Sequence, residues 1–360
     1  MNDFEALVSL NLIPQIGSAR LERLLEHFGQ PEAIFRASRQ SLTAVVGEQL
    51  GQSILDFDTG KLKADLALAQ KSGIKVLTLL DQEYPAALRQ IPGPPMVLYC
   101  LGQITPADNL AVGIVGSRQA SFYGLNNAQN FAAQLAARGI TVVSGMARGV
   151  DTFAHRGALK AKGRTLAVIG SGFKHIYPQE NADLAEEIAA CGAVISEFPM
   201  EVKPLPQNFP RRNRLISGLS LGVLITEAAR NSGALITADF ALEQGKEVFA
   251  LPGRIDSAGS LGTNALLKQG AKLVTCCEDI LEELNLVDAG GKDIEPPPEN
   301  KIPADRQERE LYGHIGDQPV AIDELVQKSS LASSRVLNLL LKLQFKKLIR
   351  ILPGKQYMRN

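Results

Sequence analysis

Residues 110–155 read LAVGIVGSRQASFYGLNNAQNFAAQLAARGITVVSGMARGVDTFAH and alternate between apolar runs and glycine-containing turns. The run Leu110–Val115 is typical of a strand that is buried on both faces of a parallel sheet. After the turn Gly116-Ser117-Arg118, apolar residues at helical spacing predict a helix that ends at Arg138-Gly139. The run Ile140–Val143 predicts the next strand. The stretch therefore predicts a β-α-β unit.

The first turn of such a unit lies at the carboxyl edge of the sheet. There the backbone N–H groups and the N-terminus of the following helix favour an anion. Arg118 lies in this turn and strengthens the preference for phosphate or carboxylate. We therefore expect the chemistry of the protein at the glycine turns of this edge.

The composition is that of a globular protein with two or three domains. The chain has 360 residues, of which 45% are hydrophobic and 21% are charged. No apolar run reaches the roughly 18 residues that span a bilayer. The start Met1-Asn2-Asp3 lacks the basic region of an export signal. We expect a cytoplasmic protein with no membrane partner.

The cysteines fit a reducing compartment. Cys100 and Cys191 are isolated, and Cys276-Cys277 are adjacent, so the spaced pairs of a zinc site are missing from the sequence. We expect buried thiols and no metal site.

Residues 71–286 alternate apolar runs with helical patterns. The predicted strands are Ile74–Leu79, Val97–Leu101, Leu110–Val115, Ile140–Val143, Thr165–Ile169, Ala193–Ser196, Gly222–Thr226, Glu247–Leu251 and Lys272–Val274. The predicted helices between them include Asn181–Ala190, Ser232–Gln244 and Glu278–Leu284. This alternation predicts an α/β fold with an extended Rossmann-like, doubly wound, mostly parallel sheet.

Residues 1–70 form a helical domain in this interpretation. Ile13–Gly17 reads as a short glycine turn, and it is followed by apolar residues at helical spacing. The segment resembles a helix-hairpin-helix, whose hairpin N–H groups can hold a DNA phosphate. A second, weaker turn lies at Val46-Gly47-Glu48. The alternative is that these helices only pack together, as in a sterile-alpha-motif-like (SAM-like) domain, and the sequence leaves both open.

The last part of the chain predicts a linker and a winged helix. Residues 287–304 are rich in Gly, Pro and acidic residues, which is typical of an extended linker. Residues 305–360 contain three helical patterns and two short strand-like pieces around Pro353-Gly354: the helices are Gln307–Ile315, Ile322–Gln327 and Ser334–Leu343. After Glu324 the chain carries eight Lys or Arg and no acid. Winged helices bind DNA grooves or dock proteins, and both roles stay open.

Cations gather near the predicted carboxyl edge, although the net charge of the chain is zero. Arg118, Arg148 and Lys174 lie in successive turns, and Lys203 precedes a basic run that comprises Phe209, Arg211, Arg212, Asn213 and Arg214. A nucleic-acid strand needs several spaced cations, whereas one nucleotide needs one or two. The phenyl ring offers a face on which a base can stack. The set favours single-stranded nucleic acid, and we expect at least one of the three arginines of the run to make an internal salt bridge.

Cofactor and catalytic motifs are weak. The turn after the first strand of the unit departs from G-x-G-x-x-G, and Gly170-Ser171-Gly172 only begins that motif. A nicotinamide enzyme is therefore not favoured. The sequence also has no G-x-x-x-x-G-K-[ST], so a common nucleotide hydrolase is not favoured either. Asp151 and His155 lie four residues apart on a predicted helix and could act as an acid–base pair. We prefer a structural interpretation, in which the aspartate caps the histidine and fixes the turn.

Six ordered motifs between about Asp81 and Ala271 resemble those of the DNA-processing protein A family, also called DprA or Smf. They are Gly116–Gly124, Ser144–His155, Gly170–Asn181, Phe209–Arg214, Glu227–Ala238 and Pro252-Gly253 with Gly262–Asn264. The resemblance implies a cytoplasmic bacterial protein without catalytic chemistry or cofactor. It implies binding of single-stranded DNA, a homodimer through the Rossmann-like domain, and loading of the RecA recombinase onto incoming DNA during natural transformation.

The resemblance also places the DNA pocket at Gly116, Ser117, Arg118, Phe209 and Arg211–Arg214, with Lys203 nearby. Lys174 departs from the family, which commonly has an acid before the Tyr-Pro pair. Two other functions stay open. One is a nucleotide- or phosphoribosyl-binding enzyme that uses Asp151 and His155, and the other is a scaffold that recruits partners through its terminal domains.

Overall fold

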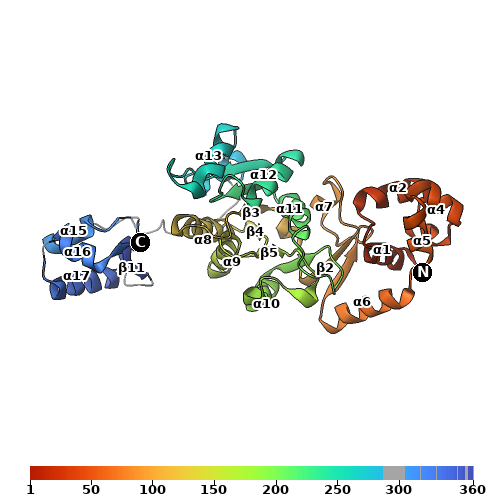
Figure 1. The fold of residues 1–360 in the computed structure, drawn as a ribbon, viewed down its shortest axis with the longest axis horizontal. Helices are drawn as coiled ribbons and strands as arrows, with labels where there is room; N and C mark the ends of the chain where they lie inside the picture. The colour runs from red at the N-terminus through yellow and green to blue at the C-terminus, as the bar shows by residue number, and fades with distance from the viewer. Residues whose placement is uncertain (287–304, 317, 330, 347, 353–355, 360) are drawn as a thin grey trace. The chain divides into compact units, whose positions relative to one another are not determined.

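The structure, a computed structural model, describes residues 1–286, 305–316, 318–329, 331–346, 348–352 and 356–359. The chain divides into two compact units, Met1–Lys292 and Asp293–Asn360 (Figure 1). The predicted linker 287–304 and the turn at Pro353-Gly354 lie outside the described residues. The boundary expected at residue 70 lies inside the first unit and stays a prediction.

Residues 1–71, all of which the structure describes, form six helices. They are α1 (Asp3–Leu12), α2 (Ser18–Phe28), α3 (Pro31–Arg36), α4 (Arg39–Val46), α5 (Glu48–Leu55) and α6 (Thr59–Lys71). Asn2 and Glu5 close a capping box at the start of α1. Both predicted turns join helices, and Gly47, between α4 and α5, has a φ of 87° that favours glycine.

Nine strands of the first unit form one sheet among the described residues. They are β1 (Lys75–Thr78), β2 (Val97–Gly102), β3 (Ala111–Val115), β4 (Thr141–Ser144), β5 (Thr165–Val168), β6 (Ala193–Ser196), β7 (Gly222–Ile225), β8 (Glu247–Ala250) and β9 (Lys272–Leu273). Their order is β1-β2-β6-β5-β4-β3-β7-β8-β9. Along this order, neighbouring strands are parallel from β6 through β5, β4, β3, β7 and β8 to β9. Strands β1 and β2 form an antiparallel edge beside β6. The doubly wound, mostly parallel sheet is confirmed, and each predicted strand is placed to within one residue at either end.

The strand order creates a switch point beside β3. The chain runs from β3 through β4 and β5 to β6 on one side, and then crosses back to β7 on the other side of β3. Ligands of doubly wound sheets bind outside the carboxyl ends of the strands at such a point. The turns that follow β3 and β7 therefore frame the expected site.

Helices cover both faces of the sheet (Figure 1). They are α7 (Ala86–Arg89), α8 (Phe122–Ala137), α9 (Val150–Lys160), α10 (Ala182–Cys191), α11 (Asn208–Gly218), α12 (Gly233–Glu243), α13 (Leu261–Lys268) and α14 (Cys277–Glu283). Successive strand side chains alternate between the faces. Ile114 packs with α8, α9 and α14, whereas Val115 packs with α11 and α12. No helix in the described part of the chain is both long and apolar enough to cross a membrane.

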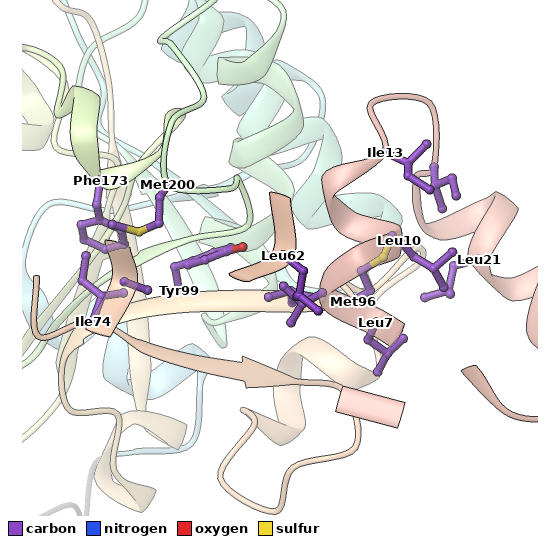
Figure 2. Close-up of a cluster of buried hydrophobic side chains, with 14 of the residues drawn as sticks. Leu7, Leu10, Ile13, Leu21, Leu62, Ile74, Met96, Tyr99, Phe173 and Met200 are labelled. Atoms are coloured by element: carbon purple, nitrogen blue, oxygen red, sulfur yellow. The ribbon is translucent and has the colours of Figure 1, made fainter. Parts of the chain in front are cut away.

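A third core joins the N-terminal helices to the sheet. Leu7 and Leu62 pack in one cluster with Met96, Tyr99 and Met200 (Figure 2). The Tyr99 hydroxyl donates to the Asp65 carboxylate at 2.6 Å, and the Met200 backbone N–H donates to the same carboxylate at 3.0 Å. Burial raises the pKa of Asp65. The N-terminal helices thus share a core and a buried polar contact with the central sheet.

The second unit has the architecture expected of a winged helix. Its helices are α15 (Arg306–Gly313), α16 (Ile322–Ser329) and α17 (Ser333–Phe345), and its strands are β10 (Val320–Ala321), β11 (Ile349–Leu352) and β12 (Gln356–Arg359). The strands form an antiparallel sheet in the order β10-β12-β11. Leu311, Leu325 and Leu340 meet in its core. Two residues are too few for a periodic pattern, and for this reason β10 was not predicted.

The expectation of buried thiols is confirmed for two of the four cysteines. The four thiols are free; Cys100 and Cys277 are buried, and Cys191 is half-buried. Cys276 is exposed, so the expectation of four buried thiols was wrong at this position. It directly precedes α14, and its N–H donates to Asp279 in the first turn of that helix.

The contact between Tyr99 and Asp65 can be tested by Tyr99→Phe. We expect a loss of about 1–2 kcal/mol in the free energy of unfolding, because a buried carboxyl loses a hydrogen-bond donor. Tyr123→Phe is the control, since the Tyr123 hydroxyl donates at the surface to the Pro252 carbonyl. Urea unfolding of the whole chain gives both values. Equal losses in the two variants would show that the buried contact does not stabilise the fold.

Candidate nucleic-acid interface

A cavity of about 730 Å³ opens at the switch point and is called the main cleft here. Its walls come from the turn after β3, the first half of α11 and the start of α12. Six of the predicted DNA-binding residues line it: Gly116, Ser117, Arg118, Phe209, Arg212 and Asn213. The fold thus brings together residues that lie almost a hundred positions apart in the sequence.

Close contacts fix the turn after β3. A Cβ atom on Gly116 would lie 2.6 Å from Val150 Cγ2 and 2.9 Å from the Glu227 carbonyl oxygen, so only glycine fits there. The Ser117 N–H donates to that carbonyl at 2.8 Å. The Glu227 carboxylate accepts from the Ser121 N–H at 2.9 Å. The turn after β7 therefore holds the turn after β3 and sets the position of Arg118.

Arg118 is exposed and lies over an aromatic ring. Its guanidinium carbon is 5.0 Å from the centroid of the Phe209 ring. Among the described residues, no carboxylate lies within ion-pair distance of Arg118. The cation–π contact directs the side chain across the main cleft and leaves its hydrogen-bond donors for a ligand.

Tyr177 completes an aromatic surface that the sequence interpretation missed. Its ring centroid lies 5.8 Å from that of Phe209, with the planes at 55°, and both residues line the main cleft. A Cβ atom on Gly170 would lie 2.9 Å from the Phe209 ring, so this glycine makes room for the phenyl group. The Tyr-Pro pair after the third glycine turn was the available sequence signal for Tyr177. Together the rings offer a platform for a planar base.

Arg212 is buried beside the cleft with unused donors. Its side chain is 3% exposed, and its Nε and Nη1 atoms have no hydrogen-bond partner. Burial lowers the pKa of Arg212 to about 10, and the nearby negative charge of Asp151 offsets part of this effect. A Cβ atom on Gly145 would lie 1.5 Å from Nη1, so glycine is required beside the guanidinium. A buried cation without a partner is costly, and the negative charge of an anion in the main cleft would offset part of that cost.

Asp151 and His155 do not form the acid–base pair that the sequence left open. The Asp151 carboxylate accepts from the Gly145 and Ala147 N–H groups at 3.1 and 3.3 Å, and so fixes the turn after β4. His155 Nδ1 lies 2.7 Å from the Thr165 hydroxyl instead. Burial lowers the pKa of His155 to about 3, so the ring is neutral at pH 7. The structural interpretation was right about the turn and wrong about a cap on the histidine.

Two further predicted cations form exposed ion pairs. Arg148 makes a two-bond contact with Glu180 at 2.5 and 2.8 Å, and Lys174 lies 2.5 Å from Glu201. Exposed pairs contribute little to stability and exchange readily with another anion. Arg148 also lines a small extension of the main cleft with Arg118 and Phe209. Lys203 is exposed and forms no ion pair with a described residue.

The remaining arginines of the basic run lie on another side of α11. Arg214 pairs with the buried Glu197 carboxylate at 2.5 Å, which confirms the expected internal salt bridge. Arg211 is 4.0 Å from the same carboxylate and 5.2 Å from the centroid of the Phe198 ring. Both line a second cavity, separate from the main cleft. Arg211 and Arg214 thus face the same carboxylate, whereas Arg212 faces the main cleft.

Family models match most of the chain. A model described as DNA recombination-mediator protein A matches residues 75–285, and one described as DprA winged helix domain matches residues 295–355. Protein Smf of Escherichia coli is 38% identical over 331 residues, which cover 88% of this chain and 88% of that protein. DNA processing protein DprA of Bacillus subtilis is 43% identical over 225 residues, which cover 62% of this chain and 76% of that protein.

Two solved structures are similar in both fold and sequence. An X-ray structure of DNA processing protein A from Streptococcus pneumoniae matches with a TM-score of 0.69 at 32% identity, covering 79% of this chain and 99% of that one. A structure of DNA processing protein A from Helicobacter pylori, described for its single-stranded DNA binding mode, matches with a TM-score of 0.53 at 32% identity. It covers 59% of this chain and 95% of that one.

The neutral, buried state of His155 predicts a pH effect on stability. The unfolded histidine titrates near pH 6.5 and the folded one near 3, so the unfolded state binds more protons between these values. The neutral ring therefore makes its full contribution to the free energy of unfolding above pH 6.5. This contribution is lost as pH falls toward 3, by up to about 1.4 kcal/mol per pH unit. We expect the Tm of His155→Gln to fall less than that of the unmodified chain between about pH 7.5 and about pH 5. An identical fall would indicate a histidine that is solvated and protonated in the fold.

Proposed function

Because the chain belongs to the DNA recombination-mediator protein A family, we propose that its main cleft binds single-stranded DNA. The observation that carries the proposal is Arg212, a buried guanidinium with two unpartnered nitrogens on the wall of this cleft. A DNA phosphate supplies the negative charge and the acceptor oxygens that suit a guanidinium on this wall. The unpartnered donors of Arg212 in the free protein thus support the binding role.

Several groups of the cleft suit a polyanion. Arg118 adds a second guanidinium from the turn after β3, and Arg148 adds a third in the extension. The turn at Gly116 and Ser117 also lines the cleft, so its backbone lies within reach of a ligand. Cations spaced along a groove track a phosphate chain, whereas one mononucleotide would use only part of them.

The aromatic platform favours an unpaired strand. A base can stack on Phe209 and Tyr177 only if one of its faces is free, and in a duplex both faces are stacked on neighbouring bases. Asn213 also lines the cleft and can donate to or accept from a base edge. The structure of the Helicobacter pylori relative, described for its single-stranded DNA binding mode, supports the same ligand.

We extend the proposal to recombination in the cytoplasm: the protein protects incoming DNA and loads RecA onto it during natural transformation. The family description as a recombination mediator supports this role. The rate of RecA filament formation on protein-coated single strands tests it. No acceleration by the chain would contradict the loading role while leaving DNA binding intact.

We also propose a homodimer through the Rossmann-like domain. Large apolar side chains are exposed around the β9 end of the sheet, and Ile255, Leu261 and Leu273 are among them. Exposed apolar groups beside an edge strand are typical of an association surface. Sedimentation equilibrium tests this proposal, and a monomer at micromolar concentration would contradict it.

The binding proposal predicts a large effect of Arg118→Ala. We expect affinity for an oligo-dT strand to fall by about tenfold or more, because a guanidinium leaves the phosphate path. The slope of log affinity against log salt becomes shallower by about 0.7 for each lost phosphate contact. Arg156→Ala is the matched control, since Arg156 is exposed on α9 and does not line the main cleft. Equal binding by the two variants in fluorescence anisotropy would count against the proposal.

Phe209→Leu separates stacking from charge. We expect weaker binding, by up to about 1–3 kcal/mol, because a base loses its aromatic partner. The salt slope stays unchanged, since no cation is removed. Measurement of both quantities by the same titration checks this. Weaker binding together with a shallower slope, as expected of Arg118→Ala, would show that the ring only positions Arg118.

A further inference from the structure

Helix α11 separates two cavities. Its residues Arg212 and Asn213 line the main cleft, whereas Arg211 and Arg214 line a second cavity of about 430 Å³. The second cavity lies between the N-terminal helices and the central sheet and is called the junction cleft here. Its walls are the turn between α1 and α2, the residues before β2, and the carboxylate of Glu197 after β6. The proposed function leaves this cleft without a role.

The junction cleft offers anion-binding groups from two directions. Arg20 on α2 and Arg211 on α11 both line it and are exposed. The start of α2 also lines it, and the N-cap residue Gly17 has no side chain that could cap the first N–H groups. Uncapped N–H groups and the positive end of a helix add to the attraction of the arginines. A phosphate matches this arrangement.

A buried carboxylate adds an acceptor to the same cleft. Glu197 is 7% exposed, and its Oε1 atom has no hydrogen-bond partner. The other oxygen pairs with Arg214, whose Nη1 atom is likewise unpartnered. These atoms call for a ligand with both donors and acceptors. A nucleotide has both, because its phosphate accepts and the amino or imino groups of its base donate.

We propose that the junction cleft binds a further nucleotide of the DNA strand that occupies the main cleft. Its phosphate lies between Arg20 and Arg211, and a donor of its base meets Glu197. The inference rests on the proposed function and extends it to the N-terminal helices. The turn at Ile13–Gly17 then takes part in DNA binding, which was one of the two roles that the sequence left open.

The arrangement of α11 favours one continuous strand over a separate ligand. Arg211 and Arg212 are consecutive residues, so their side chains leave the helix about 100° apart and serve adjacent clefts. A strand that leaves the main cleft across α11 passes the exposed Arg211 before it reaches Arg20.

The test compares Arg20→Ala and Arg211→Ala with Arg23→Ala in the full chain. Arg23 is an exposed residue of the same helix α2 and does not line the junction cleft, so it controls for lost charge. Each variant is titrated with oligo-dC strands of about 6 and about 20 nucleotides, a range that brackets single-strand binding sites. Thermal unfolding confirms that each variant is folded.

We expect Arg20→Ala and Arg211→Ala to bind the longer strand about three- to tenfold more weakly, with a salt slope shallower by about 0.7 each. Binding of the shorter strand, which the main cleft holds, stays unchanged. If Arg20→Ala behaves as Arg23→Ala does, the inference is overturned, even if Arg211→Ala weakens binding. Loss of binding to poly-glutamate instead of DNA would assign the cleft to an acidic protein and also overturn it.

The two proposals fail separately. If Arg118→Ala binds the short strand as well as the unmodified chain does, the proposed function fails. If Arg118→Ala binds weakly and the junction variants match Arg23→Ala on the long strand, only the present inference fails.

Discussion

The buried guanidinium of Arg212 is the constraint on which the carboxyl edge of the sheet depends. It lies beside Gly145 because any larger residue would overlap its Nη1 atom. Asp151 supplies a negative charge nearby, but its hydrogen bonds come from the turn after β4. The arginine lines the main cleft and keeps two buried donors without a hydrogen-bond partner. Removing a cation from water without a partner costs free energy, so the free protein is prepared for an anion at this point.

The rest of the first unit positions this group. The switch point places the turns after β3 and β7 side by side, and Glu227 ties them together. Helix α11 packs on the sheet through Leu215 and Ile216, which leaves its opposite sides free for the two clefts. The core around Tyr99 fixes the N-terminal helices against the same sheet. One rigid arrangement can therefore present cations from distant segments along a single path.

The sequence was most informative where one physical cause dominates. Strands buried on both faces of a parallel sheet are continuous apolar runs bounded by turn residues, and so their positions were predictable. The charge pairs were not, because Arg148–Glu180 and Lys174–Glu201 depend on which loops meet. The hydrogen-bond partner of His155 was likewise not predictable from the sequence. Its neighbour along the helix is Asp151, but its partner, Thr165, comes from the adjacent strand. The aromatic role of Tyr177 became visible only when the fold placed it against Phe209.

Amide hydrogen exchange of the whole chain, with and without a single-stranded oligonucleotide, is the sharpest test of DNA binding in the main cleft. We expect slower exchange in residues 116–119 and 145–148 and in the first half of α11. These segments carry the turn of Arg118, the glycine beside Arg212, and Arg212 itself. Slower exchange confined to residues 305–359, with no change around the main cleft, would contradict it and assign DNA binding to the winged helix.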